Sequence, residues 1–343
     1  MRKLLNTLYV TTPEAYLALE GETVAVKKDD DILLRVPLHN LEGIITFGYM
    51  GASPALMGEC AKRGIALSFC TAYGRFIADV KGETQGNVVL RRTQYRMADD
   101  EAQSLAIARN ILVGKLHNSR WVLERATRDH AGRLNVERVK RAGRFVADAI
   151  PKIQTAETHG TLMGIEGEAA SQYFSVFDEL VLRDKEEFYF HERSRRPPID
   201  NVNALLSFIY TILSHDVSAA LSTAGLDPFV GFLHKDRPGR RSLALDIMED
   251  LRAPLADRFV LTLINTRQVH AEDFEKRENG AVYLRDNARK TILAAWQTRK
   301  REQIVHPFLK EKIEWGLVPH AQALLLARFL RGDLDAYPPF LWK

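Results

Sequence analysis

The sequence predicts an α+β protein, in which a small N-terminal β-sandwich domain of residues 1–88 precedes a larger, mainly α-helical domain of residues 89–343. Short apolar runs between turn residues fill roughly the first 85 residues, and apolar residues recur at helical spacing from about residue 95 onward. Hydrophobic residues make up 46% of the 343 and charged residues 27%, which is a globular composition. We expect no apolar run of the ~20 residues that a membrane-spanning helix needs.

Turn signals separate the expected strands of the N-terminal domain: the glycines at 21, 43, 48, 64 and 74 and the acidic run at 29–31. The expected strands are Leu4–Val10, Tyr16–Leu19, Thr23–Val26, Ile32–Val36, Ile44–Phe47, Ile65–Phe69 and Phe76–Val80. One helix interrupts them, because Ser53 is a good N-cap, Pro54 suits the first helical position and Gly64 can end the helix.

The second domain is expected to be helical because its apolar residues recur three and four positions apart, beginning after Asp99. Clear helical patterns cover Val202–Leu213, Ser242–Asp250, Asn287–Arg301 and His320–Leu330. Asn279 and Gly280 form a tight-turn signal within this half.

Two cysteines, Cys60 and Cys70, lie outside any C-x-x-C pair, so neither a zinc site nor a disulfide framework is indicated. Asn6 and Thr7 interrupt the apolar stretch at the start of the sequence, which therefore resembles a strand more than a signal peptide. We expect a reduced, cytoplasmic protein.

Basic residues are unevenly distributed, although the net charge is only +4. Between Lys115 and Arg144 there are nine basic and three acidic residues. Smaller clusters comprise Arg193, Arg195 and Arg196, and then Lys235, Arg237, Arg240 and Arg241. A solvated helix face is the ordinary explanation for such clusters. The last one lies beside candidate metal ligands, where cations suit a phosphodiester substrate.

The candidate ligands come from three segments. Glu166 is expected near the start of a helix, His234 ends a Gly-Phe-Leu-His run, and Asp246 and Glu249 lie three apart on a helix for which Ser242 is the expected N-cap. A Glu, a His and a second carboxylate can bind Mg²⁺ or Mn²⁺ and leave positions open for water and phosphate. Such an ion can polarise a phosphodiester and activate a nucleophilic hydroxyl.

Each candidate ligand also has a purely structural explanation. Glu166 could be a first-turn carboxylate favoured by the helix dipole, and His234 could be a hydrogen-bonded structural histidine. Asp246 and Glu249 could pair with Arg240 or Arg252 at the surface.

Several segments together resemble one family, the CRISPR-associated spacer-acquisition integrases ("Cas-one"). The matching segments are Gly86–Tyr95, Gly114–Asn118, Gly164–Phe174, Arg195–Phe208, Gly231–His234 and Ser242–Glu249. The resemblance covers almost the whole chain and is greatest to the branch serving type I systems, with subtype I-C as the nearest candidate.

The resemblance implies that the catalytic metal ligands are Glu166, His234 and Glu249, with Asp246 at a supporting acidic position. Many relatives carry Asp where this chain has Glu249, so direct coordination by Asp246 stays open. Tyr173 either positions DNA near the metal or packs in the helical core. Three arginines, Arg237, Arg240 and Arg241, are the implied DNA-binding residues.

The implied activity is that of a metal-dependent DNA endonuclease and integrase in antiviral defence. Homodimers of the family flank a small CRISPR-associated partner, "Cas-two", and the 3′-hydroxyls of a short DNA fragment attack repeat phosphodiesters by transesterification. Two other functions remain open: a non-catalytic DNA-binding scaffold, and a metallohydrolase acting on small phosphoesters.

Overall fold

A computed structural model describes residues 5–29, 31–72, 74, 76–82 and 88–343 of the chain. Leu4 of the first expected strand and the expected Gly86-Asn87 motif lie outside these residues. Two compact units are present: Met1–Gly86 with Asp286–Arg301, and Asn87–Arg285 with Glu302–Lys343. Residues 286–301, which we expected in the helical domain, thus group with the N-terminal residues, while the domain boundary after residue 88 stays a prediction.

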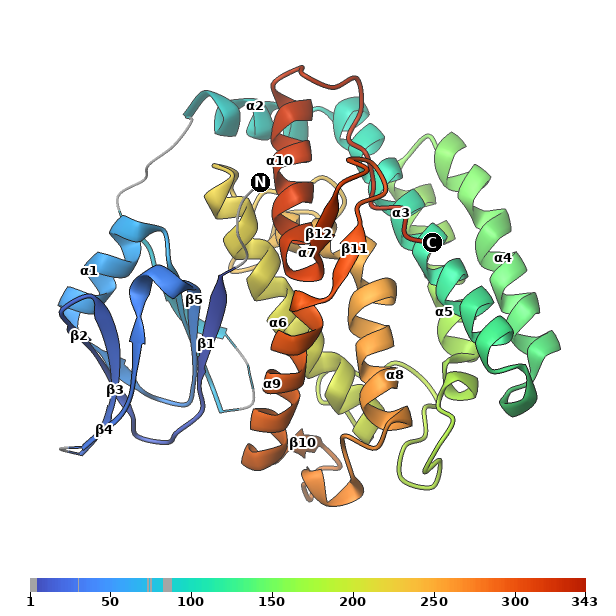
Figure 1. Ribbon diagram of the computed structural model, residues 1–343. Coiled ribbons are helices and arrows are strands. Elements are labelled where there is room, and N and C mark those ends of the chain that lie inside the picture. The colour runs from blue at the N-terminus through green and yellow to red at the C-terminus, as the bar shows by residue number, and fades with distance from the viewer. Residues whose placement is uncertain (1–4, 30, 73, 75, 83–87) are drawn as a thin grey trace. The chain divides into compact units, whose positions relative to one another are not determined.

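The first unit contains two four-stranded sheets (Figure 1). The first sheet has the order β1 (Asn6–Val10), β5 (Leu41–Phe47), β7 (Ala66–Cys70), β8 (Phe76–Val80). The second has the order β4 (Asp31–Pro37), β3 (Thr23–Lys28), β2 (Tyr16–Glu20), β6 (Gly51–Ala52). In the first sheet β1, β5 and β7 are parallel and β8 is antiparallel to β7. In the second β4, β3 and β2 are antiparallel, and the short β6 is parallel to β2.

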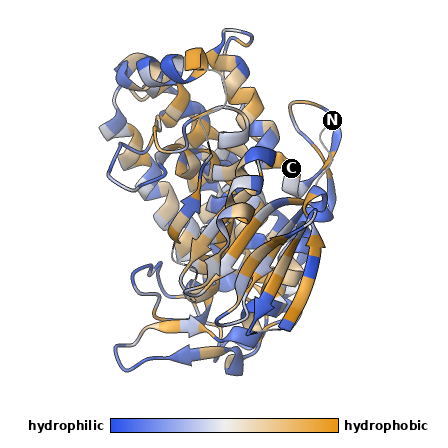
Figure 2. Ribbon diagram, turned by 90° about the vertical axis from the view of Figure 1, so that its left-hand side faces the viewer, coloured by the Kyte–Doolittle hydropathy of each residue, from blue (hydrophilic) through white to orange (hydrophobic). Residues whose placement is uncertain are grey.

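Both sheets contribute to one hydrophobic core, which helix α1 (Pro54–Arg63) also joins. Leu17, Ile44 and Leu56 are each fully buried in it. The expected caps of α1 are confirmed: the Ser53 hydroxyl accepts the backbone N–H of Leu56 at 3.2 Å, and Gly64 adopts a left-handed φ of 69°. Figure 2 shows hydrophobic and hydrophilic residues mixed along the strands of this unit.

Helix α9 (Asp286–Arg301) groups with this unit through contacts with its first sheet. The Gln297 amide donates to the carbonyl oxygen of Thr7 at 2.8 Å, and the buried Lys300 ammonium lies 3.4 Å from Oε1 of Glu42. These contacts join residues 290 and 258 positions apart, which helical periodicity alone does not predict.

The second unit is mainly helical, as expected (Figure 1). A six-residue π-helical segment, Arg252–Asp257, joins α7 to α8, and two small hairpins complete the unit: β9 (Phe274–Lys276) with β10 (Val282–Leu284), and β11 (Gln303–Val305) with β12 (Lys312–Glu314). Its α-helices are α2 (Val88–Asp99), α3 (Glu101–Asp129), α4 (Val136–Thr155), α5 (His159–Ser175), α6 (Asn201–Thr223), α7 (Ser242–Leu251), α8 (Arg258–Asn265) and α10 (Val318–Leu330).

Helix α6 is long and apolar enough to cross a membrane by length and composition, contrary to our expectation from the sequence. It packs against α7 and α10, and 61% of its most apolar window is buried inside the fold. Its apolarity therefore matches that of a core helix that is covered on most sides.

Candidate active site on helices α3, α5 and α7

Asp246 fastens the Gly-Phe-Leu-His loop onto helix α7. Its carboxylate is fully buried; Oδ2 accepts the backbone N–H groups of Phe232 at 2.6 Å and Leu233 at 3.0 Å, and Oδ1 accepts that of His234 at 2.9 Å. Gly231 allows this approach, because a Cβ there would lie 2.8 Å from Oδ2 of Asp246. Both oxygens of the Asp246 carboxylate therefore accept hydrogen bonds from the loop. This arrangement fits an acid that supports the site and not a surface partner of Arg240.

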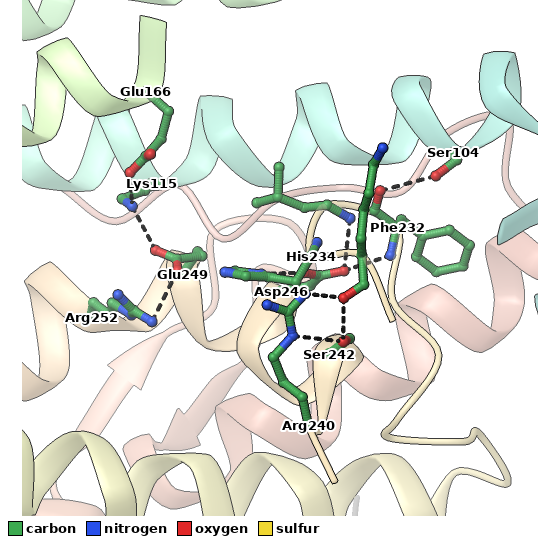
Figure 3. A network of polar contacts seen from close by, with 12 residues as sticks. Ser104, Lys115, Glu166, Phe232, His234, Arg240, Ser242, Asp246, Glu249 and Arg252 are labelled. Atoms are coloured by element: carbon green, nitrogen blue, oxygen red, sulfur yellow. Dashed lines mark hydrogen bonds and ion pairs between the residues drawn. The ribbon is translucent and has the colours of Figure 1, made fainter. Parts of the chain in front are cut away.

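The same carboxylate orients the His234 ring, whose Nδ1 lies 2.7 Å from Oδ1 of Asp246. An anion at this position favours the tautomer with its hydrogen on Nδ1, which leaves the lone pair on Nε2. Figure 3 shows the ring extending from Asp246 toward the Glu249 side of the site. His234 is therefore presented as a metal ligand or proton acceptor.

Glu249 lies one turn beyond Asp246 and is almost completely buried, with 3% exposure. Its Oε2 is 2.8 Å from Nζ of Lys115 on α3, and its Oε1 is 3.0 Å from Nη2 of Arg252. Burial acts to raise the pKa of Glu249, but Arg252 and Lys115 outweigh it and hold the pKa at about 2. Glu249 is thus a carboxylate at neutral pH.

Glu166 on α5 shares the same cation, because Oε1 of Glu166 forms a second ion pair with the Lys115 ammonium (Figure 3). Burial acts to lower the pKa of Lys115, but Glu249 and Glu166 outweigh it and raise that pKa above its usual value. One ammonium therefore bridges two acids that are 83 residues apart in the sequence.

The expected place of Glu166 in its helix was wrong. Helix α5 begins at His159, where the Thr158 hydroxyl accepts the backbone N–H of Thr161 at 3.1 Å. Glu166 lies two turns inside, so the helix dipole does not explain it. Gly164 suggested that the helix starts after it, but α5 continues through this glycine. Packing of α5 against α3 and α4 stabilises the helix there.

The three expected DNA-binding arginines have different environments. Arg237 is exposed, whereas Arg240 donates through Nε to the Ser242 hydroxyl at 3.2 Å and Arg241 lies 3.3 Å from the His215 ring. The sequence predicted Ser242 as the N-cap of α7, but Ser242 is instead the first residue of that helix. Its hydroxyl donates to the carbonyl oxygen of Lys235. Arg240 and Arg241 thus contribute to the loop structure.

Tyr173 is buried, with 3% exposure, and its hydroxyl donates to Oδ2 of Asp257 at 2.9 Å. Tyr210 donates to the other oxygen of the same carboxylate. The Tyr173 ring also packs edge-on against Phe174 and Phe177. This environment favours the packing explanation of Tyr173, although the residue lines a cavity of about 40 Å³ that also reaches Glu166.

A second, larger cavity of about 360 Å³ lies between α3 and α4. It occupies the basic stretch noted in the sequence, and the cations that line it are Arg120, Arg125, Arg128, Lys140 and Arg144. Three of them pair with acids on α3, but no ion pair joins Lys140 or Arg144 to a described residue. Trp121 contributes an aromatic surface to the same cavity.

Sequence reasoning missed Lys115 and Arg252 as parts of the site. In the sequence Lys115 was one of nine basic residues and part of the matching segment Gly114–Asn118, but it was given no role at the site, and Arg252 was considered only as a surface partner of the acids. The contact of Lys115 with Glu249 joins helices that are distant in the sequence, whereas Arg252 lies only three residues from Glu249 and its role depends on the burial of that carboxylate.

Glu166, His234 and Glu249 are the expected donors for a divalent ion. Within the described residues, no three His, Cys, Asp or Glu side chains are gathered closely enough to hold a metal. However, two carboxylates converge on a single positive charge, that of Lys115, beside an oriented imidazole. Carboxylate and imidazole groups are the donor types that Mg²⁺ and Mn²⁺ prefer, so the chemistry of Glu166, His234 and Glu249 fits such an ion, although Lys115 now occupies the position between the two carboxylates.

Comparison with known proteins gives a consistent result. Residues 8–298 match the family described as CRISPR associated protein Cas1. The chain is 52% identical over 343 residues, covering 100% of both sequences, to CRISPR-associated endonuclease Cas1 1 of Chlorobaculum tepidum.

Two solved structures extend the comparison. A CAS1 protein from Thermotoga maritima has a TM-score of 0.81 at 23% identity, over 97% of this chain and 99% of that one, and shows the shared α+β fold. A chain of a Cas6-RT-Cas1–Cas2 complex has a TM-score of 0.83 at 25% identity, over 100% of this chain and 36% of that longer one.

Proposed function

The chain belongs to the Cas1 family of CRISPR-associated endonucleases, which act as integrases in spacer acquisition, and on this premise we propose that Glu166, His234 and Glu249 form its metal-dependent active site. The observation that carries the proposal is the convergence of Glu166 and Glu249 on one cation beside the oriented His234 ring.

In this proposal Glu166, His234 and Glu249 hold Mg²⁺ or Mn²⁺. A bound divalent ion would polarise the attacked phosphodiester and stabilise the leaving oxygen. Asp246 keeps the imidazole lone pair directed into the site, and Arg252 restrains Glu249 through Oε1. Asp246 already accepts three backbone N–H groups of the loop, which supports Glu249 as the second carboxylate ligand in this proposal.

The reaction is a phosphodiester transesterification. A 3′-hydroxyl of the incoming fragment forms a new P–O bond as the bond to the displaced 3′-oxygen breaks, and the proton passes to solvent or to a nearby base. Because one phosphodiester replaces another, the reaction needs no external energy source. The product is a short DNA fragment joined to a repeat of a CRISPR array. This joining is the step by which antiviral defence records an invader.

DNA contacts are proposed at two basic surfaces. Arg237 is exposed three residues after His234, while Arg240 and Arg241 chiefly shape the loop. The cavity between α3 and α4 adds Lys140 and Arg144, which lack ion-pair partners among the described residues. Cations in these positions suit a phosphate backbone.

The assembly is proposed to be a homodimer that binds Cas2, as the partner named with one related structure suggests. Strand β4 supports a self-contact, because Ile32, Leu33 and Leu34 expose 37%, 51% and 47% of their surfaces along it. We further propose a type I system, with subtype I-C the first to test, and a cytoplasmic location.

The test is integration of a labelled DNA fragment into a repeat-containing duplex, with Cas2 and Mn²⁺ present. We expect His234→Ala to lose at least 100-fold in activity, because the site loses an oriented nitrogen donor. His130→Ala is the control, since His130 is exposed at the end of α3.

Equal activity of His234→Ala and wild type would refute the site. DNA binding without any joining or cutting by wild type would favour the non-catalytic scaffold. Cleavage of a small phosphoester without joining of DNA would favour the metallohydrolase.

A further inference from the structure

Lys115 occupies the centre of the site described above. Its Nζ contacts Oε1 of Glu166 and lies 2.8 Å from Oε2 of Glu249, so one ammonium neutralises both proposed carboxylate ligands. Arg252 adds a second positive charge at Oε1 of Glu249. Two acids are therefore already balanced by two cations.

This balance conflicts with the binding of a divalent ion. An added charge of +2 at the same carboxylates would meet the ammonium of Lys115 at close range, and like charges a few ångströms apart in a partly dry site repel strongly. Both cations would also need the same oxygens. Arg252 contacts the oxygen of Glu249 that Lys115 does not, so Lys115 is the cation in conflict.

Lys115 is able to leave. Its side chain is 17% exposed, and its charge sits on a flexible four-carbon stem. Glu166 is 15% exposed, whereas Glu249 is only 3% exposed. The ammonium is thus more accessible to solvent than Glu249, so an incoming ion can reach it.

We propose that Lys115 is a resident cation that holds the two carboxylates together before metal arrives and is displaced by the divalent ion. This inference rests on the proposed metal site. It makes Lys115 a residue that weakens metal binding and, in the metal-free protein, offsets the repulsion between the two carboxylates.

The test compares wild type with Lys115→Met, which keeps the length of the stem without the charge. Mn²⁺ binding is measured on the DNA-free protein by titration calorimetry, and Tm is measured in chelator and in Mn²⁺. We expect Lys115→Met to bind Mn²⁺ at least fivefold more tightly, because it removes a competing charge. Its Tm should fall in chelator, and Mn²⁺ should raise its Tm more than that of wild type.

Lys152→Met is the matched control, an exposed lysine on α4 for which no change in Mn²⁺ binding is expected. If Lys115→Met does not fold, Lys115→Arg replaces it. A guanidinium can grip both carboxylates and is harder to displace, so this variant should bind Mn²⁺ more weakly than wild type.

Unchanged or weaker Mn²⁺ binding by Lys115→Met, or tighter binding by Lys115→Arg, would overturn the inference. The proposed metal site has a separate test: it would be refuted if His234→Ala and Glu249→Gln both bound Mn²⁺ with the affinity of wild type. If neither wild type nor Lys115→Met binds Mn²⁺, both proposals fall.

Discussion

Gly114 on α3 lies directly against the carboxyl group of Asp250 on α7: a Cβ at position 114 would stand 2.8 Å from Cγ of Asp250 and 2.9 Å from Cβ of Pro339. The next residue on α3 and the preceding one on α7 are Lys115 and Glu249, whose ion pair crosses the same helix contact. The absence of a side chain at position 114 therefore sets the separation across which the site is built.

Gly114→Ala should force α3 and α7 apart. Overpacking of this kind costs about 1–3 kcal/mol of unfolding free energy, and here it would also lengthen the Lys115–Glu249 contact. Urea denaturation followed by tryptophan fluorescence measures the loss. Gly143→Ala is the control, because its Cβ would lie 3.9 Å from Leu123, an ordinary contact. Equal stability of the two variants would contradict the close approach.

Asp246→Asn should disable the site without removing a proposed ligand. The amide cannot accept all the hydrogen bonds that now reach the carboxylate from three backbone N–H groups and the His234 ring. We expect Mn²⁺ affinity to fall 10- to 100-fold, the usual effect of losing a group that orients a metal-binding histidine. Asp236→Asn, an exposed change in the same loop, is the control in calorimetry. Wild-type affinity in Asp246→Asn would show that the ring is oriented by something else.

Asp257 should make stability depend on pH. Burial raises the pKa of Asp257 from 3.8 to about 6, despite hydrogen bonds from Tyr210 and Tyr173 and the charges of Arg252 and Arg193. Between these two values the folded protein binds more protons than the unfolded chain, so rising pH lowers stability. The contribution amounts to about 3 kcal/mol between pH 4 and 6 and levels off above that range.

The measurement for Asp257 is the unfolding free energy of wild type minus that of Asp257→Asn, taken from pH 4 to pH 7. Other titrating groups are shared by the two proteins and cancel in the difference. A difference that does not fall across this range would mean that Asp257 ionises normally in the fold.

The basic cavity between α3 and α4 should contribute to DNA affinity. The double variant Lys140→Glu, Arg144→Glu should bind duplex DNA more weakly, and the logarithm of its affinity should depend less steeply on the logarithm of salt concentration, by about one to two units. Lys152→Glu changes the charge of α4 outside the cavity lining and is the control. An unchanged slope in fluorescence anisotropy would mean that Lys140 and Arg144 are only solvated.

Local patterns predicted most of the elements. The strands from Tyr16 to Val80 other than the two-residue β6, helix α1 with both caps, and the turn at Gly280 between β9 and β10 were expected, because strand alternation, capping and turn formation act over a few residues. The same reasoning failed at α5, where a glycine looked like a boundary, and at Ser242, where a good N-cap residue lies one position inside its helix.

The amino-acid sequence alone determined the α+β order, the family resemblance, and the residue types that can bind a metal and phosphate. Tertiary structure decided that Asp246 serves the His234 loop, that Lys115 joins Glu166 to Glu249, and that α9 packs with the N-terminal sheet. Hydrogen-bond and ion-pair partners on separate helices are chosen by distance in space, and that distance is set by close packing such as the contact of Gly114 with Asp250.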